Sequence, residues 1–265
     1  MRSEKAGSPD VSQLAEHLAP GGDSRDRIFV GTSGWAYASW KPDFYPGAVP
    51  QKKFLEYYAT QLNSVEVNYT FRQLPNASIL AGWMASTGSG FRFSFKAPQR
   101  LTHILRLKDC GDGVAALAQT LAPVAAAGRM GIVLFQLPPN FKADPARLDS
   151  FLLDAKKSRL RMAFEFRNAT WFCEKVYAVL RTHGAALCVA ENEDLATPDL
   201  VTAPFACYRL RMSGGYSAAQ LEEIRSKLLS RCSEGEVFAY FKHEDEPSGA
   251  LCAVATLQLL SQRRA

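Results

Sequence analysis

The sequence has few of the features that mark membrane, metal-binding or disulfide-stabilised proteins. No apolar run approaches the roughly 20 residues that span a bilayer. The six cysteines are scattered and form no C-x-x-C pair, so a disulfide framework is not expected. The four histidines show no H-x-x-x-H spacing, which argues against a histidine-rich zinc site. We therefore expect no membrane association, no His/Cys metal site and no cofactor that the sequence requires.

A large excess of one charge is also absent. The chain has 31 Lys and Arg residues against 26 Asp and Glu residues, a formal net charge of +5. This excess falls short of the basic clustering of a dedicated nucleic-acid binder. The polar stretch 1–26 lacks the apolar core of a secretory signal. We interpret 1–26 as a mobile tail and 27–265 as a single domain, and we expect a cytoplasmic protein.

The sequence does contain a regular alternation of β-rich runs and helical patterns. Eight runs of strand length are rich in Val, Ile, Phe or Tyr, namely 28–31, 64–69, 91–96, 132–137, 163–167, 185–190, 205–211 and 237–242. Helix signals lie between most of them, such as the Ser217-x-x-Gln220 capping box. The stretch 192–204 holds two prolines and little apolar periodicity, so the sixth helix is expected to be short or missing. This alternation predicts an α/β fold, a single (β/α)₈ TIM-like barrel.

Polar residues spaced two apart near predicted strand ends define the candidate site. Side chains alternate along a strand, so the two members of such a pair point the same way. The pairs are Glu66/Asn68, Ser94/Lys96, Glu165/Arg167, Arg209/Arg211 and Tyr240/Lys242, with Gln136 at the end of the fourth run. Active sites of this barrel lie at the carboxyl ends of the strands, and interior charges are costly unless paired. We expect glutamates facing several cations at the barrel mouth; the alternative is outward-pointing charges or a purely structural ion-pair network.

These residue types suggest acid–base chemistry on an anion. Glu66 and Glu165 are the candidate catalytic residues. The candidate substrate-binding residues are Asn68, Lys96, Gln136, Arg167, Arg209, Arg211, Lys242, Trp35, Tyr37 and His103. Trp35 and Tyr37 could form one wall of a pocket or a loop that packs on itself. His103 could be an acid, a base or a structural histidine, and Schiff-base chemistry at Lys96 or Lys242 is a further option.

Seven segments, in order along the chain, resemble the YecE-like family, also known as domain of unknown function 72. They are GTSGWAYASW (31–40), FYP (44–46), LNSVEVNYTFRQLP (62–75), FRFSFKAPQRLTH (91–103), GIVLFQLPPNF (131–141), FEFRNATWF (164–172) and YFKHEDE (240–246). The resemblance implies a TIM-like barrel and brings no established activity. Many members carry Arg-Leu-His-Gly after the seventh strand, where this chain has Arg209-Leu210-Arg211-Met212, and an Asn-rich stretch where it has Lys242-His243-Glu244. The chain therefore resembles a subgroup with a more basic mouth.

These observations favour an enzyme that acts on a phosphate- or carboxylate-bearing substrate at the barrel mouth, of hydrolase, lyase or isomerase type, without identifying the reaction. The cations would hold the anion and a glutamate would be the general acid or base. The first alternative is a non-catalytic nucleic-acid-binding module, in which the basic mouth and its aromatic residues hold a phosphate chain and stacked bases. A binding protein that has lost its chemistry is the second. The expected partner is a small anionic ligand, with nucleic acid as the alternative.

The sequence also makes a prediction about geometry. Glu66, Glu165 and Arg167 should lie at one end of one barrel of eight parallel strands. A structure with the two glutamates at opposite ends would contradict the site and leave the fold class standing.

Overall fold

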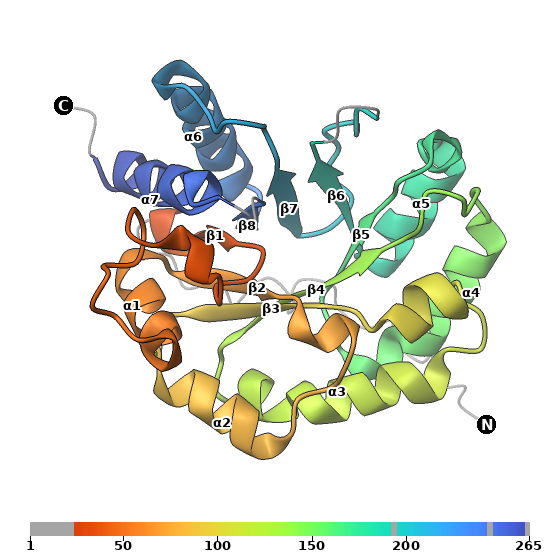
Figure 1. The fold of residues 1–265 in the computed structure, drawn as a ribbon. Helices are drawn as coiled ribbons and strands as arrows, with labels where there is room; N and C mark the ends of the chain where they lie inside the picture. The colour runs from red at the N-terminus through yellow and green to blue at the C-terminus, as the bar shows by residue number, and fades with distance from the viewer. Residues whose placement is uncertain (1–23, 192–194, 243–245, 263–265) are drawn as a thin grey trace, which may run out of the picture.

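The computed structural model describes residues 24–191, 195–242 and 246–262 (Figure 1). The strands are β1 (Ile28–Thr32), β2 (Ser64–Val67), β3 (Arg92–Lys96), β4 (Met130–Gln136), β5 (Met162–Glu165), β6 (Ala186–Ala190), β7 (Phe205–Leu210) and β8 (Glu236–Phe241). The helices are α1 (Phe54–Gln61), α2 (Ala77–Ala85), α3 (Gly111–Ala126), α4 (Pro145–Ala155), α5 (Glu174–His183), α6 (Ala218–Cys232) and α7 (Ser248–Ser261). Every predicted strand is present, and its ends differ from the prediction by at most two residues.

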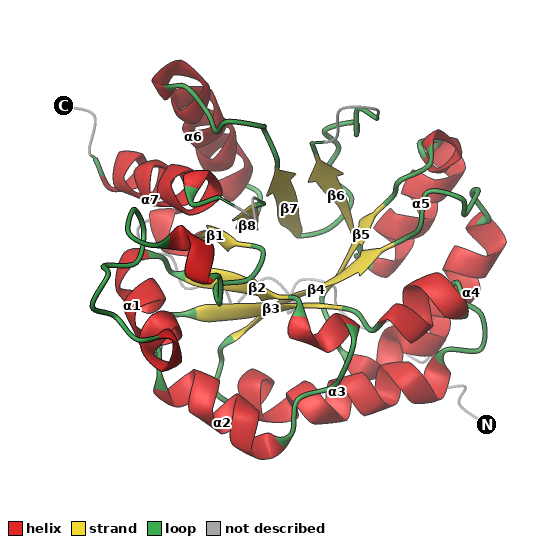
Figure 2. Cartoon of the chain, in the orientation of Figure 1, coloured by secondary structure: helices red, strands yellow, loops and turns green. Residues whose placement is uncertain are grey.

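The strands form one parallel sheet in the order β1-β8-β7-β6-β5-β4-β3-β2. A bridge between Ser33 and Glu66 joins the two ends of this sheet just beyond β1. The strands lie at the centre and the helices surround them, as Figure 2 shows. The predicted TIM-like barrel is therefore confirmed.

The connection from β6 to β7 contains no helix in its described part, residues 195–204. Side chains hold it in place instead. The Thr202 hydroxyl accepts a hydrogen bond from the Leu187 backbone N–H and donates to the Ala185 carbonyl, each at 2.8 Å. The expectation of a missing sixth helix agrees with this segment, because its prolines remove the backbone donors that a helix needs.

The structure describes only part of the predicted N-terminal tail and of the segment that follows β8. Residues 1–23 of the predicted tail lie outside the described residues, and Ser24–Arg27 form a 3₁₀ turn directly before β1. His243 and Glu244, which follow β8, also lie outside them. The division into a tail and one domain stays a prediction.

Inward-facing side chains change from apolar to polar along the barrel axis. The barrel interior holds a buried apolar cluster of Phe29, Ile132, Leu134, Ala163, Ala186, Cys188, Phe205, Cys207, Phe238 and Tyr240. Two residues beyond Leu134, Ala163 and Cys207 come the buried polar residues Gln136, Glu165 and Arg209. Two further buried polar residues, Ser33 and Glu66, contact Arg209 from the ends of β1 and β2. Because side chains alternate along a strand, the polar set lies directly above the apolar one. The fold thus places a polar layer at the carboxyl ends of the strands.

Side chains complete the junction between β1 and β2. The Asn63 side chain accepts a hydrogen bond from the Val30 backbone N–H at 2.7 Å and donates to the Ile28 carbonyl at 2.9 Å. The Tyr58 hydroxyl accepts a bond from the Thr32 backbone N–H at 2.8 Å. These contacts replace ladder bonds that the two strands do not make to each other. Gly31 lies in the middle of this junction, where a Cβ atom would overlap the Ser64 carbonyl oxygen.

We expect Gly31→Ala to lower the free energy of unfolding by about 3 kcal/mol or more, since a methyl group there must displace backbone rather than a flexible side chain. Gly47→Ala is the matched control, because a Cβ at Gly47 meets nothing within 4 Å. Urea denaturation of both variants provides the measurement. Equal stabilities would show that the close approach of the two strands is not needed.

Candidate functional site

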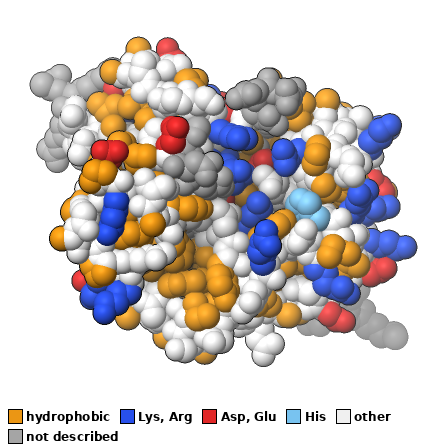
Figure 3. All heavy atoms as spheres, in the orientation of Figure 1, with side chains coloured by type: hydrophobic (Ala, Val, Ile, Leu, Met, Phe, Trp, Pro, Cys, Tyr) orange, Lys and Arg blue, Asp and Glu red, His pale blue; other side chains and the backbone are white. Residues whose placement is uncertain are grey.

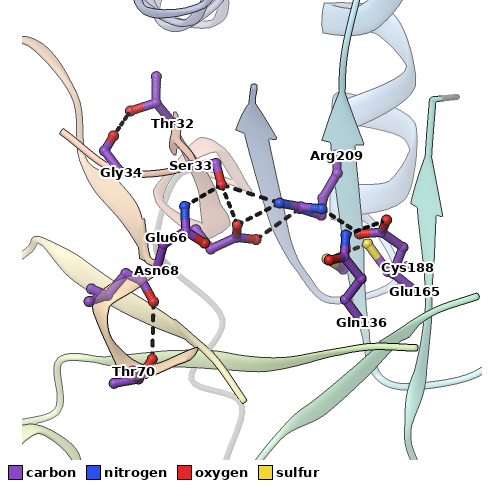
Figure 4. A network of polar contacts seen from close by, with 12 residues as sticks. Thr32, Ser33, Gly34, Glu66, Asn68, Thr70, Gln136, Glu165, Cys188 and Arg209 are labelled. Carbon is purple, nitrogen blue, oxygen red and sulfur yellow. Dashed lines mark hydrogen bonds and ion pairs between the residues drawn. The ribbon is translucent and has the colours of Figure 1, made fainter. Parts of the chain in front are cut away.

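Arg209, on β7, lies at the centre of the polar layer and bonds to both predicted glutamates (Figure 4). Its Nε and Nη2 donate to the Glu66 carboxylate at 3.0 and 2.8 Å. Its Nη1 donates to the Glu165 carboxylate. Glu66 is fully buried, and Arg209 and Glu165 are 4% and 6% exposed. The predicted meeting of Glu66 and Glu165 at one end of the barrel is confirmed, while their catalytic role stays a prediction.

Neutral donors complete the hydrogen bonding of the two carboxylates. The Ser33 hydroxyl donates to Glu66 at 2.6 Å, and the Asn68 amide donates to that hydroxyl at 2.9 Å. On the other side of Arg209, the Gln136 amide donates to Glu165 at 2.7 Å. Asn68 and Gln136 therefore hold the glutamates rather than pointing away from them. Ser33 was missed by the sequence argument, although its spacing of two from Gly31 places it on the inward face.

The charge of Arg209 keeps Glu165 ionised. Burial alone would raise the pKa of Glu165, but the charge of Arg209 and the Gln136 hydrogen bond outweigh it, so this pKa lies below its ordinary value. Burial opposes the charge of Arg209 as well, yet the two glutamates raise its pKa well above the usual range. At neutral pH Glu165 is thus a proton acceptor rather than a donor, which narrows the acid or base role predicted for it.

The guanidinium of Arg209 is committed to these partners. All three of its nitrogens donate to Glu66, Glu165 or Ser33. A guanidinium has a fixed number of donors, and here they point at protein oxygens. The substrate-binding role that the sequence predicts for Arg209 stays a prediction, with most of its N–H donors directed at protein oxygens.

A cavity of about 70 Å³ lies above Arg209 and Glu165. It is lined by Gln136, Glu165, Arg167, Ala190, Glu191, Arg209, Arg211 and Lys242. Arg167 and Arg211 are exposed at its rim, and Lys242 is half-buried. On the face shown in Figure 3, Lys and Arg side chains gather near the middle and toward the right. The cavity lining thus contains members of three of the five predicted polar pairs, together with Gln136.

Glu191 is a cavity residue that the sequence argument missed. Its carboxylate accepts a bond from the Arg211 backbone N–H at 2.8 Å and another from the Tyr216 hydroxyl. It ties the loop after β7 to the end of β6. Its position directly after the predicted sixth strand could have identified Glu191 as a site residue, because functional groups of this fold lie at the carboxyl ends of the strands.

Lys96 and His103 contact the same aromatic ring, that of Phe71. The Lys96 ammonium lies 4.5 Å from the ring centroid, and the His103 ring packs nearly perpendicular to it at 5.2 Å. Burial lowers the pKa of Lys96 to about 8, and the positive charge of Arg209 adds to the effect. The pKa of His103 is lowered by burial and by the charges of Lys96 and Arg167. Neither residue lines the cavity itself; both lie beside it.

The aromatic wall expected from Trp35 and Tyr37 is not seen at the cavity. Trp35 packs edge-on against Trp83 with ring centroids 5.5 Å apart. Tyr37 packs on Trp40 and donates a hydrogen bond to the Ser33 carbonyl at 3.0 Å. Tyr37 is thus engaged within the loop after β1, whereas Trp35 packs on α2, because large rings bury more surface against one another than against a polar pocket.

The described residues include no group of three or more His, Cys, Asp or Glu side chains placed to hold a metal ion. Within the same part of the chain, no helix is long and apolar enough to cross a membrane.

Removal of Arg209 tests the polar layer. Arg209→Gln leaves two buried carboxylates without their cation, so we expect it to lower the free energy of unfolding by about 3 to 5 kcal/mol at pH 7. Arg181→Gln is the matched control, because its ion pair with Glu174 is 45% and 74% exposed. A surface pair of that kind contributes at most about 1 kcal/mol.

The loss of stability caused by Arg209→Gln should depend on pH. In the wild type the folded pKa of Glu165 is below its unfolded value, so its stabilisation is present above the unfolded pKa and is lost as the pH falls. In Arg209→Gln the carboxyl pKa values rise instead, so the variant loses stability as the pH increases above about 4.3. Denaturation at pH 5 and pH 8 should therefore show a larger difference between the two proteins at pH 8. A difference that is constant with pH would contradict this assignment.

Comparisons with known proteins relate the chain to one family and to curated proteins of two bacteria. It matches a family described as "Protein of unknown function DUF72" over residues 29–265. It is 30% identical over 149 residues to the UPF0759 protein YecE of Escherichia coli K12, an alignment covering 56% of this chain and 51% of YecE. It is 28% identical over 156 residues to the UPF0759 protein YunF of Bacillus subtilis, covering 57% and 54% of the two chains. The chain thus aligns with about half the length of these curated relatives.

Solved structures agree with the fold. The crystal structure of a DUF72 family protein from Thermotoga maritima has a TM-score of 0.79 at 23% identity, covering 89% of this chain and 99% of that one. A DUF72 family protein from Enterococcus faecalis has a TM-score of 0.70 at 17% identity, covering 89% and 98%. The likeness in sequence order, the shared barrel and the match over residues 29–265 lead to one conclusion: the chain belongs to the DUF72 family.

Proposed function

We propose that the protein is an enzyme that acts on a small substrate bearing a phosphate or carboxylate group, bound at the carboxyl ends of the barrel strands. The charge of the cavity lining is the observation that carries this proposal. Four cations and two carboxylates line it, so the lining has a net positive charge. Arg209 is already neutralised by the glutamates beside it, whereas Arg167 and Arg211 are exposed to an incoming anion and Lys242 adds its positive charge to the lining.

The size of the cavity supports a small anionic group. Pockets that enclose a whole ligand usually measure about 300 to 1,000 Å³. A cavity of about 70 Å³ suits a single phosphate or carboxylate group. We infer that the anionic end of the substrate enters the cavity and that the rest lies over the mouth, toward Lys96 and His103.

The roles of the side chains follow from their environments. The two exposed arginines offer forked donors that match the oxygens of a phosphate or carboxylate. Glu165, held ionised by Arg209 and Gln136, is oriented to accept a proton from a bound substrate. The groups come from different strands of one barrel, the arrangement by which this fold supports chemistry.

Inorganic phosphate should stabilise the wild-type protein by mass action, by about 2.7 kcal/mol at a concentration 100 times its Kd. The double variant Arg167→Gln/Arg211→Gln should bind phosphate at least about tenfold more weakly, since charge-assisted hydrogen bonds contribute about 1.5 to 3 kcal/mol each. Thermal unfolding with phosphate, and with chloride at matched ionic strength, measures the effect. Arg181→Gln is the control. Equal shifts with phosphate and chloride would mean that the mouth has no specific anion site.

Catalysis itself needs a separate assay. A panel of small phosphate- and carboxylate-bearing compounds is incubated with the protein and followed by mass spectrometry. Glu165→Gln should reduce any turnover by about 100-fold or more while phosphate binding remains, because general-base catalysis contributes at least that much. Turnover that is unchanged in Glu165→Gln would remove this residue from the mechanism.

One observation favours a second candidate, nucleic-acid binding. Tyr69 is 40% exposed, and its ring packs edge-on against Trp83 at 5.9 Å, at the same end of the barrel as the basic mouth. An exposed aromatic ring beside cations is typical of single-strand binding. Fluorescence anisotropy with labelled single-stranded and duplex oligonucleotides at two salt concentrations tests it. Binding that falls steeply with salt and weakens in Tyr69→Ala would favour this candidate over the enzyme.

A further inference from the structure

Lys96 points from the end of β3 into the barrel mouth. Two residues before it, the Ser94 hydroxyl accepts a hydrogen bond from the Tyr240 hydroxyl at 2.6 Å inside the barrel. Side chains two residues apart on a strand share a face, so Lys96 is directed the same way. Its amine is close enough to Arg209, Glu66, Glu165 and Lys242 for their charges to act on its pKa. Lys96 is thus part of the same electrostatic centre as the cavity.

The amine of Lys96 is held without a carboxylate partner among the described residues. The two nearest glutamates, Glu66 and Glu165, are turned toward Arg209 and form their ion pairs with it. The Lys96 ammonium packs over the Phe71 ring instead. Burial of the side chain, the positive charge of Arg209 and the lack of a direct carboxylate contact favour the neutral amine, and they outweigh the cation–π contact with Phe71, which by itself favours the ammonium. A neutral lysine amine is a nucleophile.

We propose that Lys96 is the nucleophile that forms an imine with the carbonyl carbon of an anionic substrate held by Arg167, Arg211 and Lys242. This inference rests on the proposed function and narrows its substrate class to aldehydes and ketones that carry a phosphate or carboxylate group. It also narrows the reaction to lyase or isomerase chemistry, since an imine acts on the bonds next to the former carbonyl carbon.

The chemistry balances without an oxidant or a metal. The nitrogen lone pair of Lys96 forms a C–N bond to the carbonyl carbon while the C=O π electrons move to oxygen, which takes up a proton. The nitrogen gives up a proton to Glu165 or to water. That proton then passes to the hydroxyl, which leaves as water while the nitrogen lone pair forms C=N, so one water is released for each protonated imine. The protonated imine withdraws electrons from the adjacent carbon, from which Glu165 can accept a proton.

His103 fits this scheme as a neutral neighbour. Burial and the charges of Lys96 and Arg167 lower its pKa, so at neutral pH it adds no further positive charge beside the imine nitrogen. The Thr102 hydroxyl lies 2.8 Å from its Nδ1 and fixes the ring. A neutral imidazole at this position can exchange protons with the carbinolamine.

Reductive trapping tests the proposal on the full chain. The protein is incubated with pyruvate or dihydroxyacetone phosphate and sodium cyanoborohydride, which reduces an imine to a stable secondary amine. Intact-mass measurement and peptide mapping then locate the adduct. We expect one adduct, on Lys96, that is absent in Lys96→Arg and retained in the control Lys108→Arg, whose lysine is exposed. Saturating inorganic phosphate should slow labelling by about tenfold or more, because it competes for the same cations.

The pH dependence gives a second readout. With a pKa of about 8, the neutral fraction of Lys96 falls about tenfold per pH unit below pH 8 and levels off above it. Ordinary exposed lysines, with a pKa of about 10.4, should still gain reactivity between pH 8 and pH 10. Labelling spread over exposed lysines, or unchanged in Lys96→Arg, would overturn the assignment.

The two proposals can fail separately. Phosphate stabilisation of both wild type and Lys96→Arg shows that the anion site and the fold are intact in the variant. If that stabilisation is observed and neither ketone labels Lys96, the imine is wrong and the anion-binding enzyme stands. If Lys96 is labelled and phosphate neither stabilises the protein nor slows labelling, the nucleophile stands and the anion site is wrong.

Discussion

The ion pairing of one arginine with two glutamates inside the barrel is the interaction on which the site depends. Arg209 on β7 reaches Glu66 at the end of β2 and Glu165 at the end of β5, so it connects strands on different sides of the barrel. Removing three charges from water is costly, and only close contacts and additional donors offset that cost. Ser33 and Gln136 supply those donors. The result is a buried, hydrogen-bonded floor beneath the mouth.

This floor assigns different tasks to residues of the same chemical type. Arg209 is occupied by protein carboxylates, whereas Arg167 and Arg211 stand exposed at the rim and are available to a ligand. Glu165 is kept ionised as a proton acceptor. Lys96, which lies near the pair but outside its hydrogen bonds, is shifted toward its neutral form by burial and by Arg209. The charges in the floor therefore also act on the pKa of the lysine beside it.

The way in which the barrel closes contributes to this arrangement. β1 and β2 are joined largely through Asn63, Tyr58 and the bridge from Ser33 to Glu66. Because Ser33 and Glu66 belong both to that junction and to the polar layer, closure of the sheet and assembly of the site are one event. A substitution that disturbs the junction between β1 and β2 would therefore also shift Glu66, which forms an ion pair with Arg209.

Local sequence predicted the strands, the helix signals and a short or missing sixth helix, which agrees with the described residues 195–204, because hydrophobic periodicity and prolines act over a few residues. The spacing of two predicted that the members of each polar pair share a face, since alternation follows from strand geometry alone, and the structure shows that Glu66, Glu165 and Arg209 face inward. Tertiary structure decided which side chains meet. That Arg209 pairs with both glutamates, that Trp35 packs on Trp83, and that Glu191 reaches the loop after β7 all depend on the register between strands and on the paths of loops. Those distances are set by the closed barrel as a whole, and no short stretch of sequence contains them.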